Sequence, residues 1–150
     1  MNTSSQSNET RLQEAHTLVQ RYIQSIIERD VESWMSLWDD NFVLEFPFAP
    51  QGRPPRIENK AALYPYIQTV INDLEILNIS RQEIYLTQDP DLIIAEIAGE
   101  GRITSTGRNY KAGYVWIMRT KNGKLIHMRD YWNPLAALEA RGGLDTTNKS

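Results

Sequence analysis

The period of the hydrophobic pattern changes near Glu75, and no other feature of the sequence constrains the fold as strongly. Before that point apolar residues recur every three or four positions, as on helices with one buried face. Beyond it they alternate with polar residues, as in strands with one buried face. A chain with helices first and strands afterwards is expected to form an α+β domain, with the helices packed on one face of the sheet.

Three helices and one strand are expected in the first half of the chain. Asp30 is a suitable N-cap for the second helix, because its carboxylate can accept hydrogen bonds from the first turn. Pro65 lies inside the third, where it either kinks the helix or marks its true start. The predicted elements are helices at Thr10–Arg29, from Asp30 through Trp38 and at Glu58–Asn72, and a strand at Phe42–Phe48.

Four strands and a closing helix are expected in the second half. Asn122 and Gly123 form a strong hairpin signal, because both residues tolerate a positive φ. Pro134 suits the first turn of a helix, and Gly142 ends that helix. The predicted strands cover Glu75–Thr87, Leu92–Thr104, Asn109–Thr120 and Lys124–Asn133, and the predicted helix covers Leu135–Arg141.

Length and composition indicate one domain at 10–143, with disordered tails at 1–9 and 144–150. The net charge of −3 is dispersed along the chain, so we expect no nucleic-acid partner. There is no cysteine and only two histidines, His16 and His127, so we expect no metal site. The sequence has no nucleotide-binding motif, signal peptide or membrane span, so we expect no cofactor, no membrane contact and a cytoplasmic location.

The alternation of the last two strands predicts a pocket. One face of these strands is apolar and aromatic, and it carries a single carboxylate, that of Asp130. This face combines Tyr110, Ala112, Tyr114, Trp116 and Met118 with Ile126, Met128, Asp130 and Trp132.

Asp130 is the leading candidate for acid–base chemistry, because an aromatic environment raises the pKa of a carboxyl group. Two interpretations stay open: proton transfer, or a structural acid bound to Arg129, Arg102 or a backbone amide. Tyr22, on the buried stripe of the first helix, is either a hydrogen-bond donor in the pocket or a structural tyrosine. His127 falls on the opposite sheet face, which argues against a His–Asp dyad.

Other charged strand residues are expected outside the pocket. Glu45 alternates with apolar residues of its strand and is expected to face solvent. Glu96, Glu100 and Arg102 share one strand face, which suits exposed cross-strand charge pairs.

Three segments resemble known families. Leu18–Tyr22 and Asp40–Pro47 resemble the first helix and first strand of ketosteroid isomerases. Arg129–Pro134, with the sequence R-D-Y-W-N-P, resembles the SnoaL-like branch that contains the phenazine-biosynthesis A/B proteins. Both groups belong to the nuclear transport factor 2 superfamily. The resemblance implies a cone-shaped, curved mixed or antiparallel sheet with three helices on its concave face, a homodimer and a pocket without a cofactor.

Some site residues of these families have counterparts here and others do not. The isomerase tyrosine that stabilises the enolate oxygen falls on Tyr22, but the catalytic aspartate of those isomerases falls on Phe46. The acid of the phenazine-type proteins falls on Asp130, and their pocket histidine falls on Leu77. The acid and the tyrosine are therefore present, and the histidine is absent.

These observations predict an isomerase, cyclase or dehydratase that acts on a small apolar or aromatic molecule. Alternatives are a non-catalytic ligand-binding domain, a condensation enzyme like the phenazine proteins, or a protein-interaction module. Asp130 and Tyr22 are the expected catalytic residues. The expected substrate-binding residues are Trp34, Phe46, Leu77, Tyr110, Tyr114, Trp116, Met128 and Trp132.

Overall fold

The first helix begins earlier than the sequence pattern indicates. In the computed structural model, which describes residues 7–142, α1 covers Asn8–Ile27. Ser7 caps this helix, because its hydroxyl accepts a hydrogen bond from the Thr10 amide at 3.0 Å. Residues 8 and 9 therefore belong to the helix and not to a tail. The other residues expected in tails, 1–6 and 144–150, lie outside the described residues.

The second helix is shorter than expected, and the first strand starts sooner. α2 covers Val31–Met35, with Asp30 as its N-cap as the sequence predicted. β1 covers Trp38–Glu45, so Trp38 belongs to the strand and not to the helix. The reason is long-range: Trp38 pairs with Leu125 at the start of the last strand, and this pairing overrides the local turn signal.

The third helix, α3, covers Lys60–Asp73 and contains the proline without a break. Asn59 caps it, and its side chain accepts a hydrogen bond from the Ala62 amide at 2.8 Å. Pro65 therefore does not mark the start of the helix. The short strand β2 (Arg56–Ile57) pairs antiparallel with β1, in a segment where the sequence predicted neither a helix nor a strand.

The sheet has six strands in the order β2-β1-β6-β5-β4-β3. All neighbouring pairs are antiparallel except β1 and β6, which are parallel, so the sheet is mixed. Asn122 and Gly123 both have positive φ, 52° and 79°, and form the predicted hairpin turn. The long strands are β3 (Leu74–Leu86), β4 (Leu92–Ile103), β5 (Asn109–Lys121) and β6 (Lys124–Trp132).

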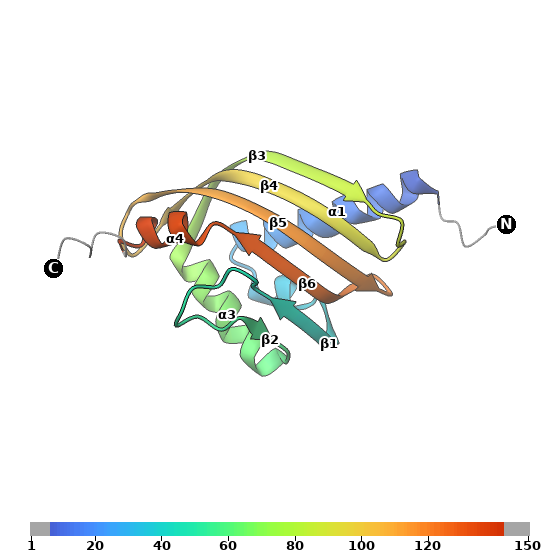
Figure 1. Cartoon of the computed structure of the whole chain (residues 1–150), viewed down its shortest axis with the longest axis horizontal. Helices are drawn as coiled ribbons and strands as arrows, with labels where there is room; N and C mark the ends of the chain where they lie inside the picture. The colour runs from blue at the N-terminus through green and yellow to red at the C-terminus, as the bar shows by residue number, and fades with distance from the viewer. Residues whose placement is uncertain (1–6, 143–150) are drawn as a thin grey trace.

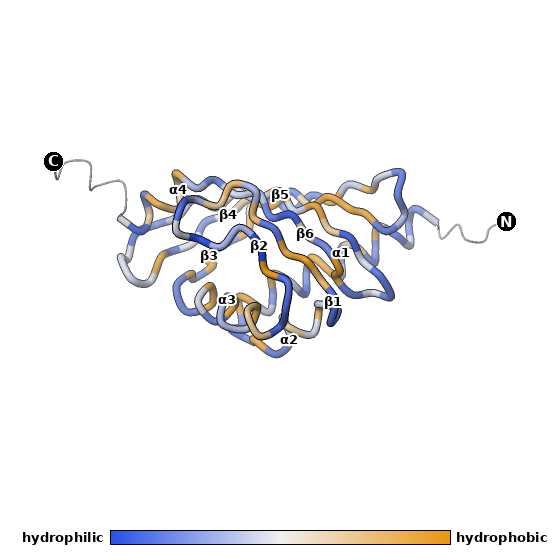
Figure 2. The backbone as a smooth tube through the Cα atoms, turned by 60° about the horizontal axis from the view of Figure 1, so that its bottom comes forward, coloured by the Kyte–Doolittle hydropathy of each residue, from blue (hydrophilic) through white to orange (hydrophobic). Residues whose placement is uncertain are grey.

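The helices cover one face of this curved sheet (Figure 1). In the turned view of Figure 2 the sheet arches over α2 and α3. Buried residues of the helices and of the inner sheet face form one core, so the predicted α+β fold with helices on the concave face is confirmed. The closing helix α4 (Pro134–Ala140) is capped by Asn133 and packs beside β5. No described helix is long and apolar enough to cross a membrane.

Two bulges bend β3 beside the core. The pairing of β3 with β4 skips Leu77 and Ser80, and each extra residue reverses which side chains face inward. The bulged strand β3 runs very close to β4. A Cβ atom on Gly99 of β4 would overlap the carbonyl oxygen of Asn78 in β3, and one on Gly101 would overlap that of Glu75. Any larger residue at either position would therefore force the two strands apart.

A further irregularity lies at the start of β6. Leu125, expected on the outer face with His127, is fully buried. The pairing of β6 with β5 shifts here, because it skips Ile126. From Met128 onward the alternation is as predicted, with Met128 and Asp130 directed into the core.

Candidate functional site

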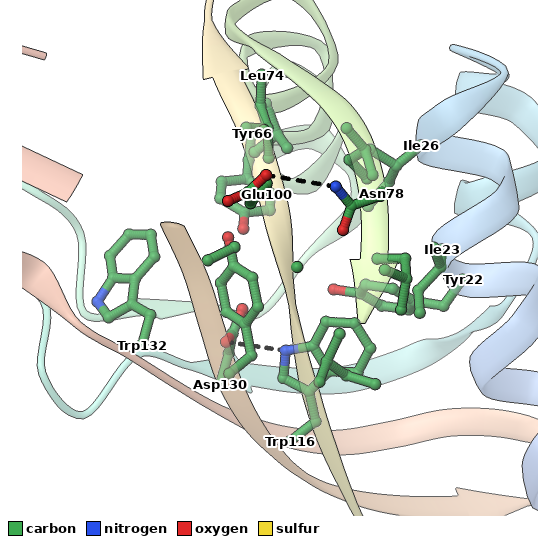
Figure 3. Close-up of a pocket in the computed structure, with 18 residues that line it drawn as sticks. Tyr22, Ile23, Ile26, Tyr66, Leu74, Asn78, Glu100, Trp116, Asp130 and Trp132 are labelled. Carbon is green, nitrogen blue, oxygen red and sulfur yellow. Dashed lines mark hydrogen bonds between the residues drawn. The ribbon is translucent and has the colours of Figure 1, made fainter. Parts of the chain in front are cut away.

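A cavity of ≈ 80 Å³ lies between α1, α3 and the inner face of strands β3 to β6 (Figure 3). Aromatic and aliphatic side chains form most of its walls, and Asp130 supplies a buried carboxylate. The aromatic walls are Tyr22 from α1, Tyr66 from α3, Tyr114 and Trp116 from β5, and Trp132 from β6.

Asp130 is buried in this cavity without a cationic partner among the described residues. It lies opposite Trp116 in the β5–β6 ladder, and the Trp116 indole Nε1–H donates to Oδ1 at 3.1 Å. Burial raises the pKa of Asp130 to about 7, although the hydrogen bond from Trp116 lowers it. The arginines that could have made it a structural acid are elsewhere: Arg102 pairs with Glu75 at 3.0 Å, and Arg129 is on the outer face.

Three tyrosines surround the carboxyl group from different elements. Burial raises the pKa of Tyr22 and of Tyr114 well above the ordinary value, and it does the same for Tyr66. The negative charge of Asp130 raises each of these pKa values further. The three hydroxyl groups therefore stay protonated and can donate hydrogen bonds at any ordinary pH.

Some expected wall residues support the cavity from behind. Tyr110 accepts a hydrogen bond from the Tyr114 hydroxyl at 3.3 Å, and Phe46 stacks on Trp132 with 5.8 Å between ring centroids. Trp34 packs against Tyr22 at 5.4 Å. These residues, and the fully buried Met128, lie in the core and do not line the cavity.

Leu77 is the one expected site residue that faces solvent. Its side chain is 42% exposed, because the bulge in β3 turns it away from the core. The neighbouring Ile76 and Asn78 line the cavity in its place. Leu77 therefore does not line this cavity, contrary to its expected place among the substrate-binding residues.

Among the polar residues that line the cavity, sequence reasoning missed three. Tyr66 lies on the buried stripe of its helix as Tyr22 does, so the same argument would have identified it. Asn78 and Glu100, which form a 3.4 Å hydrogen bond, stand at the rim. Glu100 was expected outside the pocket, and no local signal marks the β3 bulges that bring this pair to it.

The outer face of the sheet carries a separate charged pair. His127 and Glu45 lie 2.7 Å apart, between Nε2 and Oε1, on the face opposite Asp130. The hydrogen bond from His127 lowers the pKa of Glu45. Glu45 is thus half-buried and paired, where the sequence predicted a solvated side chain. Within 7–142 no group of three or more histidine, cysteine, aspartate or glutamate side chains could hold a metal ion.

This arrangement suits proton transfer. A carboxyl group with a pKa of about 7 exchanges a proton readily at neutral pH. Protonated hydroxyls close to it can stabilise negative charge on an oxygen atom of a bound molecule. The apolar walls exclude water from both groups.

Comparison with known proteins gives consistent matches along most of the chain. The SnoaL-like domain family matches residues 19–128. YesE of Bacillus subtilis, an uncharacterized protein, is 38% identical over 125 residues, which are 83% of this chain and 85% of YesE. An uncharacterized PhzA/B-like protein of Pseudomonas aeruginosa is 35% identical over 120 residues, 80% of this chain and 84% of that protein.

A solved structure confirms the architecture. The crystal structure of a proposed isomerase from Bacillus subtilis superimposes with a TM-score of 0.84 at 37% sequence identity. The match covers 89% of this chain and 96% of the other.

Proposed function

Because this chain belongs to the SnoaL-like domain family, we propose that it is an isomerase, cyclase or dehydratase in which Asp130 moves a proton on a small organic molecule. The observation that carries the proposal is the burial of Asp130 in an aromatic cavity with a single, neutral hydrogen-bond donor. The similar structure from Bacillus subtilis, itself described as a proposed isomerase, supports this class of reaction.

The geometry suggests a simple division of roles. The Asp130 carboxylate takes a proton from a carbon atom next to a carbonyl group of the substrate. The electron pair of the broken C–H bond moves onto the carbonyl oxygen, where the Tyr22 hydroxyl stabilises the charge. Asp130 then returns the proton, to another carbon atom in an isomerisation or to a departing hydroxyl group in a dehydration.

The size of the cavity favours a compact substrate. A volume of ≈ 80 Å³ is well below the roughly 300–1,000 Å³ of pockets that hold drug-sized ligands. Condensation of two ring compounds, as in a phenazine-type reaction, would need more room. The likeness to the PhzA/B-like protein therefore supports the fold more than that reaction.

Deuterium exchange tests proton transfer without knowledge of the natural substrate. Cyclopentanone, with six non-hydrogen atoms, is incubated with the protein in D₂O at neutral pD, and NMR follows deuterium entering next to the carbonyl. We expect exchange above the buffer rate with the wild type and its loss in Asp130→Asn. Glu83→Gln removes an exposed carboxylate outside the cavity and serves as the control.

The same experiment separates catalysis from simple binding. Two results together would contradict the proposal that the protein is an enzyme. One is an exchange rate equal to that in buffer alone, and the other is equal affinity of the wild type and Asp130→Asn for cyclopentanone. They would instead favour a binding domain that uses Asp130 only as an anchor.

A further inference from the structure

The residues that line the cavity include acidic side chains but no basic ones among the described residues. Two carboxylates, Asp130 and Glu100, lie on the cavity, and no lysine, arginine or histidine of the described chain lines it. In the view of Figure 3, Asp130 and Trp116 are at one end, and Glu100 and Asn78 are at the other. Glu100 is exposed at the rim and paired with Asn78, so Asp130 is the one acidic group buried inside the cavity within the described residues.

The nearest cations stand outside the walls. Arg53 and Arg141 lower the pKa of Tyr66 by their charge, but neither lines the cavity. Arg141 is already paired with Asp73, at 2.8 Å between Nη2 and a carboxylate oxygen, and Arg53 is exposed on a loop. An anionic ligand would find no partner inside and would be repelled by Asp130.

Asp130 itself lacks a strong partner. Trp116 donates to Oδ1, and no residue of the described range donates to Oδ2. A buried carboxylate gains most from a charged N–H donor, because such hydrogen bonds are shorter and stronger than neutral ones. The surrounding tyrosine oxygens can accept further N–H groups, and aromatic rings attract cations.

We propose that the molecule recognised by this cavity carries a protonated amino group, which pairs with Asp130 among the five aromatic walls. This inference rests on the proposed function, because it names the substrate class of the same site. The ammonium group would favour the ionised form of Asp130 and so keep it available as a base. The small volume of the cavity, ≈ 80 Å³, favours a small aliphatic or cyclic amine.

Matched small molecules test the proposal directly. Cyclopentylamine, protonated at pH 8, and cyclopentanol, neutral, differ mainly in charge, and cyclopropanecarboxylate of the same atom count supplies the anion. Binding is measured by calorimetry and by the fluorescence of Trp116 and Trp132, which line the cavity. The proteins are the wild type, Asp130→Asn and the outer-face control Glu83→Gln.

We expect the wild type to bind the amine about tenfold or more tightly than the alcohol, and the carboxylate more weakly than either. Asp130→Asn should remove the preference for the amine, and Glu83→Gln should keep it. Preference for the carboxylate, or an amine preference that survives in Asp130→Asn, would overturn the inference. Binding of the alcohol without preference for the amine would overturn this inference alone, whereas no binding of any probe would also contradict the pocket under the proposed function.

Discussion

Asp130 is held in the core at the expense of stability. In the folded state burial raises its pKa from 3.8 to about 7, so the folded protein retains a proton that the unfolded chain has lost. The contribution of Asp130 to stability is therefore expected to fall as pH rises from about 4 to 7 and to change little above that. The groups that face Asp130, namely Tyr22, Tyr66, Tyr110 and Tyr114, have raised pKa values and stay neutral throughout.

Asp130→Asn should therefore stabilise the protein in a pH-dependent way. The difference between 3.8 and about 7 corresponds to at most about 4 kcal/mol of unfolding free energy. We expect a gain approaching this size at pH 8 and almost none at pH 3, where Asp130 is largely protonated in both states. Urea unfolding at the two pH values measures the gain. An equal gain in stability at both pH values would mean that burial does not raise the pKa of Asp130.

The Tyr22 hydroxyl is expected to act in the reaction and not in the packing. Tyr22→Phe keeps the ring, which packs on Trp116 at 4.6 Å, and removes the donor. Loss of one donor to developing charge slows comparable reactions by about 10²–10³, so deuterium exchange should fall by that order while the melting temperature changes little. Tyr64→Phe, on the exposed side of α3, is the matched control. Unchanged exchange in Tyr22→Phe would return Tyr22 to a structural role.

At the scale of single elements, β3 shows where sequence reasoning ends. The alternation of β5 and β6 predicted the placement of Asp130 and Trp116, because the ladder runs without a shift from His127 to Trp132. The same reasoning failed at Leu77, since a bulge depends on contact with β4 and leaves no mark in its own sequence. β2 and the early start of β1 were missed for the same reason: both depend on pairing with a distant segment.

The close approach of β3 and β4 gives a sharp test of this element. A Cβ on Gly99 would overlap the Asn78 backbone, whereas a Cβ on Gly113 would meet no atom within 4 Å. Gly99→Ala should therefore cost about 1–3 kcal/mol, and Gly113→Ala should be close to neutral. Urea unfolding of both variants measures the difference. Equal stability of the two variants would show that the bulged strand can shift without loss.

For the whole molecule, the outer sheet face is the surface left without cover. The helices occupy the concave side, yet Val115, Tyr85 and Phe48 on the other side are 39%, 46% and 56% exposed. Phe48 packs edge-on against Tyr131 at 5.3 Å, and both border a hollow of ≈ 520 Å³ that also includes Val115. Exposed apolar surface of this kind marks interaction sites.

We therefore expect the homodimer that the family resemblance implied, formed through this face. Light scattering after size exclusion should give twice the 17.3 kDa of one chain. Val115→Lys places a long charged side chain in the hollow, opposite Glu96, and should yield the mass of one chain, because its length and charge disrupt an apolar contact. Ile27→Lys, at an exposed apolar position on α1, should leave the mass unchanged. A wild type with the mass of one chain would contradict the dimer, and a dimer that survives Val115→Lys would place its interface elsewhere.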